Sequence, residues 1–148
     1  MKVKAIMAAV LVAGLGAGLA IAADGTHDSR SALMKKMGGA AGALTAIAKG
    51  EKPYDADAVK AALTTMSETA KVFPAQFGPG TETGDPAASP KIWENMDDFK
   101  AKAAKLESNA NTLIAQLPTD AAGVGNALKT LGADCGACHQ AYRINVKQ

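Results

Sequence analysis

Four apolar stripes constrain the fold of this 148-residue chain more than any other feature of its sequence. In each stripe the apolar residues recur at alternating steps of three and four, which keeps them on one face of a helix with 3.6 residues per turn. The stripes are, in chain order, Leu33, Met37, Ala40, Leu44 and Ile47; Val59, Leu63, Met66, Ala70 and Phe73; Met96, Phe99, Ala103, Leu106, Ala110, Leu113 and Leu117; and Val124, Leu128, Leu131, Cys135, Cys138 and Tyr142. No stretch alternates with a period of two, so nothing indicates a sheet. The sequence therefore predicts an all-α protein.

Turn and capping residues separate these stripes. Residues 50–55 contain a glycine, a proline and Asp55, which can cap the second helix. The segment 73–90 holds four prolines and three glycines and is predicted to be a loop, whose last two residues, Ser-Pro, suit the start of the third helix. Residues 117–120, Leu-Pro-Thr-Asp, end that helix and begin the fourth. Two short connections and one longer one favour an antiparallel up-down-up-down four-helix bundle.

Residues 1–22 have the pattern of a secretory signal peptide. Lys2 and Lys4 precede an apolar run, and Ala20-Ile-Ala22 offers a cleavage site. The alternative is a membrane anchor, but the run is barely long enough to span a bilayer and consists mainly of Ala and Gly. We expect cleavage after Ala22, which leaves residues 23–148 as one domain in the periplasm with no attachment to the membrane.

Cleavage also removes the apparent basic charge. The full chain has 16 Lys and Arg against 14 Asp and Glu, and the segment lost contains Lys2 and Lys4 but no acid. The mature chain is therefore balanced. It has no basic stripe and few aromatic residues, so we expect no nucleic-acid partner. The stripes are rich in Ala, Met and Leu, which leaves a core with room for something besides side chains.

The segment Cys135-Gly-Ala-Cys138-His139 matches the C-x-x-C-H signature of covalent haem attachment. On a helix the two thiols share a face and can reach one porphyrin edge, and the histidine lies close enough to ligate the iron. A thioredoxin-like pair would be expected at the start of a helix in a βαβ unit, and a zinc site would need four ligands although the only other histidine is His27. A disulfide would leave the adjacent histidine unexplained. We therefore expect one haem c, bound through Cys135 and Cys138 with His139 as an iron ligand.

Several collinear segments resemble the class II cytochromes c, the family of cytochrome c′. The haem motif and its continuation to residue 143 lie close to the C-terminus, as in that class, whereas ordinary class I cytochromes c carry the motif near the N-terminus. The likeness extends through residues 30–38, 49–55, 77–82 and 90–93, so it covers essentially the whole mature chain. The resemblance implies a four-helix bundle that holds a single haem.

The resemblance also implies that a first-helix residue four positions after an arginine faces the haem. Here Met34 follows Arg30 by four. In cytochrome c′ proper this position does not ligate the iron, whereas in the low-spin members of the class a methionine does. The loop 77–82 resembles cytochrome c′, but residues 38–42 lack an aromatic side chain that many of those proteins carry there. We favour Met34 as the second metal ligand, with Met37 as a rival sulfur and simple packing of Met34 as the alternative.

The second ligand decides the predicted function. Ligation by Met34 opposite His139 would raise the reduction potential and suit a one-electron carrier that serves redox partner proteins. Without it, the resemblance implies a five-coordinate iron that binds NO or CO. We find no catalytic triad, phosphate loop or acid–base pair and predict no enzyme. Relatives occur as monomers and as homodimers, and the sequence leaves both open.

Further candidates for the haem site come from the resemblance. Arg30 would pair with a haem propionate, the alternative being an exposed side chain. Arg143, one turn after His139, resembles the basic residue beside the family's haem-ligating histidine, the alternative being a solvated helix end. Asp85 matches a position near the haem edge. We expect Trp93 to pack in the core and His27 to be solvated.

Overall fold

The computed structural model describes residues 25–145, so the predicted signal peptide at residues 1–22 lies outside the described residues. In the described range, no helix is both long enough and apolar enough to cross a membrane. The helices are α1 (His27–Ala48), α2 (Ala56–Val72), the 3-10 helix η1 (Phe73–Phe77), α3 (Lys91–Glu94), α4 (Met96–Ala115) and α5 (Ala121–Tyr142).

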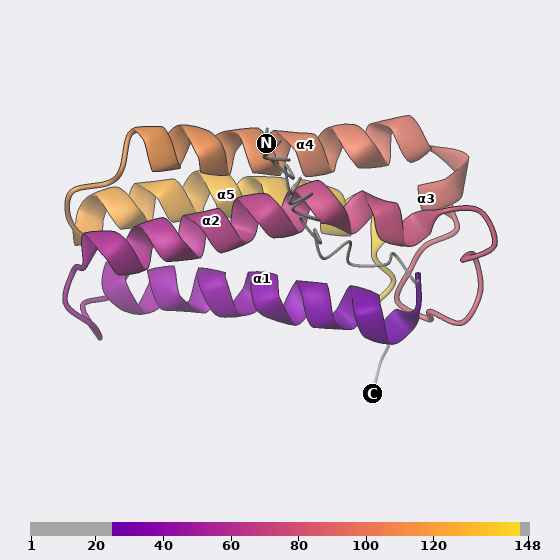
Figure 1. Ribbon diagram of the computed structural model, residues 1–148, viewed down its shortest axis with the longest axis horizontal. Coiled ribbons are helices and arrows are strands. Elements are labelled where there is room, and N and C mark those ends of the chain that lie inside the picture. The colour runs from indigo at the N-terminus through magenta and orange to yellow at the C-terminus, as the bar shows by residue number, and fades with distance from the viewer. Residues whose placement is uncertain (1–24, 146–148) are drawn as a thin grey trace, which may run out of the picture.

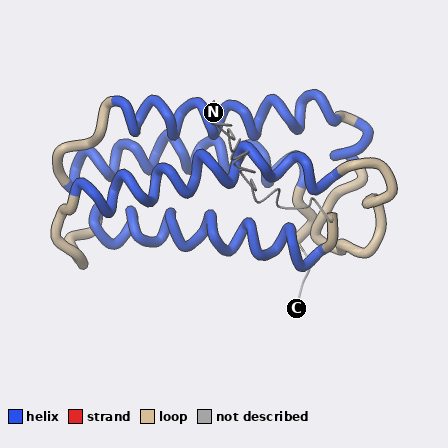
Figure 2. The backbone as a smooth tube through the Cα atoms, in the orientation of Figure 1, coloured by secondary structure: helices blue, strands red, loops and turns tan. Residues whose placement is uncertain are grey.

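The four long helices form the predicted up-down-up-down bundle (Figure 1). Each packs on its two neighbours, with contacts between α1 and α2, α2 and α4, α4 and α5, and α1 and α5. The short connections 49–55 and 116–120 lie together at one end, which we call the closed end (Figure 2). The long connection 73–95 lies at the other end, the open end, together with the start of α1 and the end of α5.

Side-chain caps begin three of the long helices, and the cap by Asp55 is the one that the sequence predicts. Asp55 Oδ1 accepts a hydrogen bond from Ala58 N at 2.9 Å, and Asp120 Oδ1 accepts one from Gly123 N at 2.7 Å. Thr26 caps α1 in the same way. After α1 the chain turns through Gly50 with a φ of 73°, a left-handed conformation that favours glycine.

Two details of the prediction are wrong. Residues 73–77 form the 3-10 helix η1 rather than a loop, since this short turn continues α2 and buries Phe77. The third helix is not continuous: Asn95, with φ −132° and ψ 46°, separates α3 from α4. The Asn95 side-chain amide donates to Lys91 O at 3.2 Å, a local bond of the kind with which asparagine competes against helix continuation.

The bundle has two cores of different composition. An aliphatic core, centred on Leu44, Leu63, Val124 and Leu131, runs from the closed end to the middle of the bundle. At the open end five of the six aromatic residues form an aromatic cluster: Phe73, Phe77, Trp93, Phe99 and Tyr142. Phe77 and Phe99 lie edge to face with 4.9 Å between ring centres, and Phe99 packs in the same way on Tyr142 at 5.3 Å.

Candidate functional site

A cavity of about 740 Å³ opens at the open end, between α1, α5, part of α4 and residues 85–88 of the long connection. Its walls include Cys135, Cys138 and His139 and most of the aromatic cluster. This volume is within the range of cofactor pockets, roughly 300–1,000 Å³. The motif residues that the sequence singled out therefore lie on the wall of one large cavity.

Small residues on three helices make room for this cavity. Gly38 and Ala41 of α1, Ala70 of α2 and Ala103 of α4 all line it. A Cβ atom built on Gly38 would meet no heavy atom within 4 Å. Two small residues of the stripes, Ala70 and Ala103, thus leave space as the composition of the stripes predicts, and Gly38 and Ala41 beside the first stripe add to it.

The haem motif lies in the last two turns of α5. Cys135 and Cys138 are both half-buried free thiols on the cavity wall. Burial raises the pKa of both thiols, with the charge of Asp134 adding to the effect at Cys135. Both sulfurs therefore stay protonated at neutral pH.

His139 lines the same cavity one position after Cys138. The side chain is exposed at the edge of the cavity, where partial desolvation and then the charge of Arg143 lower its pKa and favour the neutral imidazole. A neutral imidazole is the form that binds a metal. In residues 25–145 no group of three or more His, Cys, Asp or Glu side chains is arranged to hold a metal ion by itself, so the zinc alternative has no ligand set there.

Two methionines of α1 lie on the cavity wall. Met34 is half-buried, whereas Met37 is only 6% exposed and packs in the aliphatic core. A sulfur that ligates iron must reach into the open part of the cavity, and Met34 is the less enclosed of the two. Ligation by Met34 stays a prediction.

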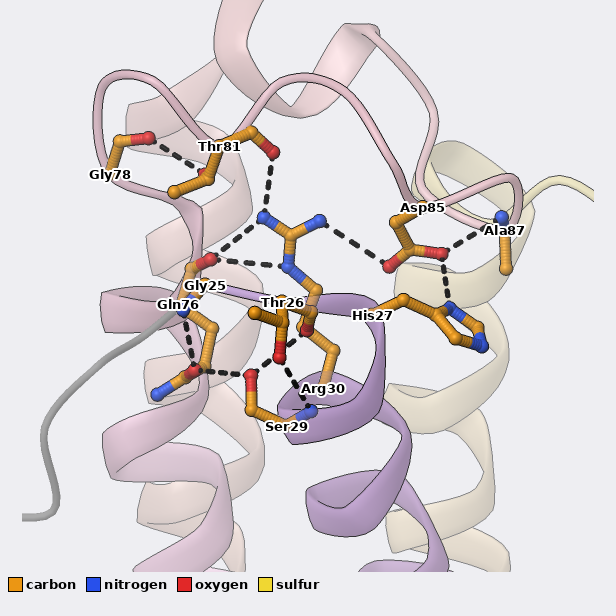
Figure 3. A network of polar contacts seen from close by, with 10 residues as sticks. All are labelled: Gly25, Thr26, His27, Ser29, Arg30, Gln76, Gly78, Thr81, Asp85 and Ala87. Atoms are coloured by element: carbon orange, nitrogen blue, oxygen red, sulfur yellow. Dashed lines mark hydrogen bonds and ion pairs between the residues drawn. The ribbon is translucent and has the colours of Figure 1, made fainter.

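Arg30 is buried, with 3% of its surface exposed, so the alternative of a solvated side chain is wrong. Its Nε and Nη2 donate to Gln76 O at 3.1 and 2.8 Å, and Nη2 also donates to Thr81 O at 2.9 Å (Figure 3). The guanidinium lies over the Phe77 ring, 4.0 Å from its centre, and near Trp93, which packs as predicted. Pairing with a haem propionate, for which Nη1 is the nitrogen less used, stays a prediction.

Asp85 faces α1 rather than standing alone at the cavity edge. Its Oδ1 lies 2.9 Å from His27 Nδ1 and accepts from Ala87 N at 3.0 Å, while Oδ2 accepts from Arg30 Nη1 at 3.3 Å. Burial alone would raise the pKa of this carboxyl, but these hydrogen bonds outweigh it and hold the pKa below its usual value. The expectation that His27 is merely solvated is therefore wrong: its side chain is 46% exposed, yet it binds Asp85.

Arg143 follows α5 directly and is exposed, and it also borders the cavity. Its backbone forms an isolated antiparallel bridge with Ala88. Its charge is one of the two causes that lower the pKa of His139. Arg143 is thus both a solvated helix end and a basic neighbour of the histidine.

The sequence reasoning missed two acids that are positioned at the site. Asp134 is buried beside Cys135, accepts from Asn109 Nδ2 at 2.6 Å and lies 3.9 Å from Lys105 Nζ. Its place three residues after Leu131 was a readable signal that it lies on the buried face of the helix. Asp98 accepts a 2.5 Å hydrogen bond from the Tyr142 hydroxyl, 44 residues away, and no local pattern predicts that pair.

These features fit haem c. Two neighbouring thiols on one helix face, a neutral imidazole one position later and an apolar cavity with aromatic walls form the donor set and the space that this group requires. The alternative that the two cysteines form a structural disulfide finds no support in the geometry, since both sulfurs are free.

Comparisons with known proteins agree with this fit. The family model described as Cytochrome C′ matches residues 26–143. The chain is 72% identical to cytochrome c-556 of Agrobacterium tumefaciens (strain apple 185) over 120 residues, 81% of this chain and 95% of the relative. It is 61% identical to cytochrome c-556 of Agrobacterium fabrum over 97% of both chains. The solved structure of cytochrome c′ from Rhodopseudomonas palustris superposes with a TM-score of 0.75 at 31% identity, covering 82% of this chain and 97% of the other.

Proposed function

Since the chain belongs to the cytochrome c′ family and its cofactor is haem c, we propose that it is a one-electron carrier of the periplasm. Cys135 and Cys138 would hold the haem through thioether bonds, and His139 and Met34 would be the iron ligands. The bound haem supplies a one-electron Fe(III)/Fe(II) couple. No catalytic reaction is proposed, and the partners are redox proteins that deliver and remove the electron.

One observation carries the choice of Met34. It lines the same cavity as His139, on the facing helix, and it is not enclosed in the aliphatic core as Met37 is. The preceding turn is fixed by buried Arg30, whose hydrogen bonds hold the start of α1 in place. A thioether held opposite an imidazole raises the reduction potential, which suits a carrier that must accept an electron readily.

The remaining residues prepare the site. The lowered pKa of His139 favours the unprotonated imidazole, which is able to bind. The rings of Phe77 and Phe99 and several small residues line this largely apolar cavity, which would lower the access of water to the cofactor. Export to the periplasm rests on the predicted signal peptide at residues 1–22 and on the family.

A gas-binding protein is the second candidate. It is favoured by the Rhodopseudomonas relative, which is named cytochrome c′ and shares the fold at 31% identity. In that case Met34 would pack without ligating the iron, and the haem would supply a site for NO or CO. The same site thus supports two functions that differ in one bond.

Optical spectra and a CO titration of the mature protein separate the two. We expect low-spin spectra in both oxidation states and CO binding only where Met34 is displaced. Met34→Leu should become high-spin, bind CO readily and have a lower reduction potential. Met37→Leu is the matched control and should behave like the wild type.

Two results would change this assignment. A wild-type protein that is high-spin and binds CO freely establishes the gas-binding function instead. A Met34→Leu protein that stays low-spin, combined with a Met37→Leu protein that does not, moves the ligand to Met37.

A further inference from the structure

Residues 85–89, which we call the strap, contact both facing walls of the cavity. Four of them, Asp85 to Ala88, line the cavity themselves. One end of the strap is bonded to α1 and the other to the segment in which α5 ends. The strap therefore joins two helices that are far apart in the sequence but lie on opposite sides of the candidate haem site.

The carboxylate of Asp85 makes the hydrogen bonds that join the strap to α1. His27 Nδ1 lies 2.9 Å from Asp85 Oδ1, and Arg30 Nη1 lies 3.3 Å from Asp85 Oδ2 (Figure 3). Arg30 is almost fully buried, and its other hydrogen bonds go to carbonyls of Gln76 and Thr81. Asp85 is thus bound to a part of α1 that has little freedom to move.

The bonds to the α5 side are made by the backbone. Ala87 O accepts from Ile144 N at 2.9 Å, and Ser89 N donates to Tyr142 O at 3.0 Å. Ala88 and Arg143 pair between these bonds as an isolated antiparallel bridge. The strap is therefore held against residues 142–144, where α5 ends, by a single antiparallel bridge.

The carboxylate of Asp85 also fixes the turn that connects these two sets of bonds. Asp85 Oδ1 accepts from Ala87 N at 3.0 Å, and Asp85 O accepts from Ala88 N at 3.2 Å. This arrangement is an Asx-turn, in which an aspartate side chain orders the backbone that follows it. Loss of the carboxylate would release both the α1 contact and the turn.

The strap contacts α1 and the end of α5 at residues that lie four positions from a predicted iron ligand. Arg30 precedes Met34 by four residues, and Arg143 follows His139 by four. We infer that Asp85 is a positioning residue, which through the strap sets the spacing between the helix that carries Met34 and the helix that carries His139. This inference rests on the proposed function, because it concerns the ligand pair proposed there.

The geometry disfavours a direct contact of Asp85 with the haem. Both carboxylate oxygens already accept hydrogen bonds from His27, Arg30 and Ala87. A haem propionate carries the same charge and would be repelled by Asp85. The sequence-based expectation that Asp85 lies near the haem edge stays a prediction, and the inference concerns its action through α1 and the strap.

The test compares Asp85→Ala and Asp85→Asn with the control Glu82→Gln, an exposed carboxyl of the same connection. In Asp85→Ala we expect CO affinity to rise about tenfold, which corresponds to about 1.4 kcal/mol. The amides of Ser89 and Ile144 should also exchange faster with solvent. Asp85→Asn should show a smaller effect, since its amide oxygen can still accept from Ala87 N. Glu82→Gln should match the wild type in both measurements.

A milder variant keeps the test decisive if Asp85→Ala does not fold. His27→Ala removes one partner of the carboxylate at a side chain that is 46% exposed. It should shift CO affinity and amide exchange in the same direction, by less than Asp85→Ala. If neither His27→Ala nor Asp85→Asn differs from Glu82→Gln, the inference is overturned.

A double-mutant cycle separates the positioning role from the proposed function. If Asp85 acts through the Met34 bond, Asp85→Ala should leave CO affinity unchanged once Met34→Leu is present. An equal rise in both backgrounds would overturn the positioning role while leaving Met34 as the ligand. A Met34→Leu change that alters neither spectrum nor CO affinity would refute the proposed function itself.

Discussion

The two ends of the bundle use the same helices and the same three-and-four residue spacing but different side-chain volumes. At the closed end Val59, Leu63 and Val124 are fully buried and fill the space between the helices. At the open end the stripe positions that face inward include Ala70 and Ala103, and a cavity of about 740 Å³ remains. Periodicity thus sets which face of a helix is inside, whereas side-chain volume decides whether that inside is packed or left for a cofactor.

The two ends also differ in what holds the helices together. At the closed end the contacts are aliphatic, with one polar link from the Tyr54 hydroxyl to Pro118 O at 2.6 Å. At the open end, polar bonds of Arg30, Asp85 and Tyr142 connect α1, the long connection, α4 and α5 around the cavity. Hydrogen bonds are directional, so they can fix the distance between the helices that border the cavity. Side-chain packing cannot do this where no side chains fill the space.

The largest expected effect comes from removing the thioether bonds at the open end. The double variant Cys135→Ser, Cys138→Ser should retain no haem after denaturing electrophoresis, as shown by haem staining. Its circular dichroism should stay helical, because the closed end does not depend on the cofactor. Ala137→Ser, an exposed change between the two cysteines, should retain the haem. Covalent haem in the double variant would show that the open end binds it by other residues.

A truncation in the aliphatic core should affect stability and leave the cofactor unchanged. Leu63→Ala removes a side chain with 0% exposure and should lower the free energy of unfolding by about 2–5 kcal/mol. The visible spectrum should not change. The control Val72→Ala, at a side chain 38% exposed, should shift stability by less than about 0.5 kcal/mol. Urea unfolding measures both, and a spectral change in Leu63→Ala would contradict the independence of the two ends.

A pair of glycines in α1 tests whether the cavity needs its small residues. At Gly38 and Gly42 an added Cβ meets no heavy atom within 4 Å, but only Gly38 lines the cavity. Gly42→Ala should stabilise the haem-bound protein by about 0.5–1 kcal/mol through lower backbone freedom in the unfolded chain. Gly38→Ala should stabilise the haem-bound protein by less, because its methyl group enters the space that the haem uses. If urea unfolding gives the same increase in the free energy of unfolding for both variants, the haem does not approach Gly38.

The smallest effect concerns pH at the open end. The hydrogen bond to Asp98 raises the pKa of Tyr142 to about 12, above the usual value of about 10. Because the pKa is raised in the folded state, the contribution of this hydrogen bond to folding stability is complete below pH 10 and is lost as the pH rises through 12. Ultraviolet titration of the phenolate should show this late ionisation, which Tyr142→Phe abolishes and Asp98→Asn moves to lower pH. Ionisation of Tyr142 near pH 10 in the wild type would contradict the bond.

The helices and the motif could be predicted because their signals are local. The stripes, the cap Asp55 and the C-x-x-C-H spacing all depend on residues within a few positions of one another. The break at Asn95 was missed because Ile92 and Met96 are four residues apart, so the helical spacing of apolar residues is kept across the junction between α3 and α4. Periodicity does not report a local bond that interrupts a helix.

The polar framework of the site could not be predicted for a different reason. The buried Arg30 side chain donates hydrogen bonds to the carbonyls of Gln76 and Thr81, which are 46 and 51 residues away in the sequence. His27 meets Asp85 across 58 residues. Nothing near His27 or Arg30 distinguishes a bound side chain from a solvated one, so their partners follow only from the fold.

The up-down-up-down topology has a practical consequence for attaching this protein to an electrode. Both ends of the described chain lie at the open end (Figure 1), where His27 and Ile144 line the cavity, so a terminal tag would anchor the molecule with its cofactor end near the anchoring surface. The exposed turn 50–53 lies at the opposite end, and exposed turns of this kind tolerate insertion well. A linker placed in that turn would orient the haem toward the solution, whereas a terminal linker would orient it toward the conductor.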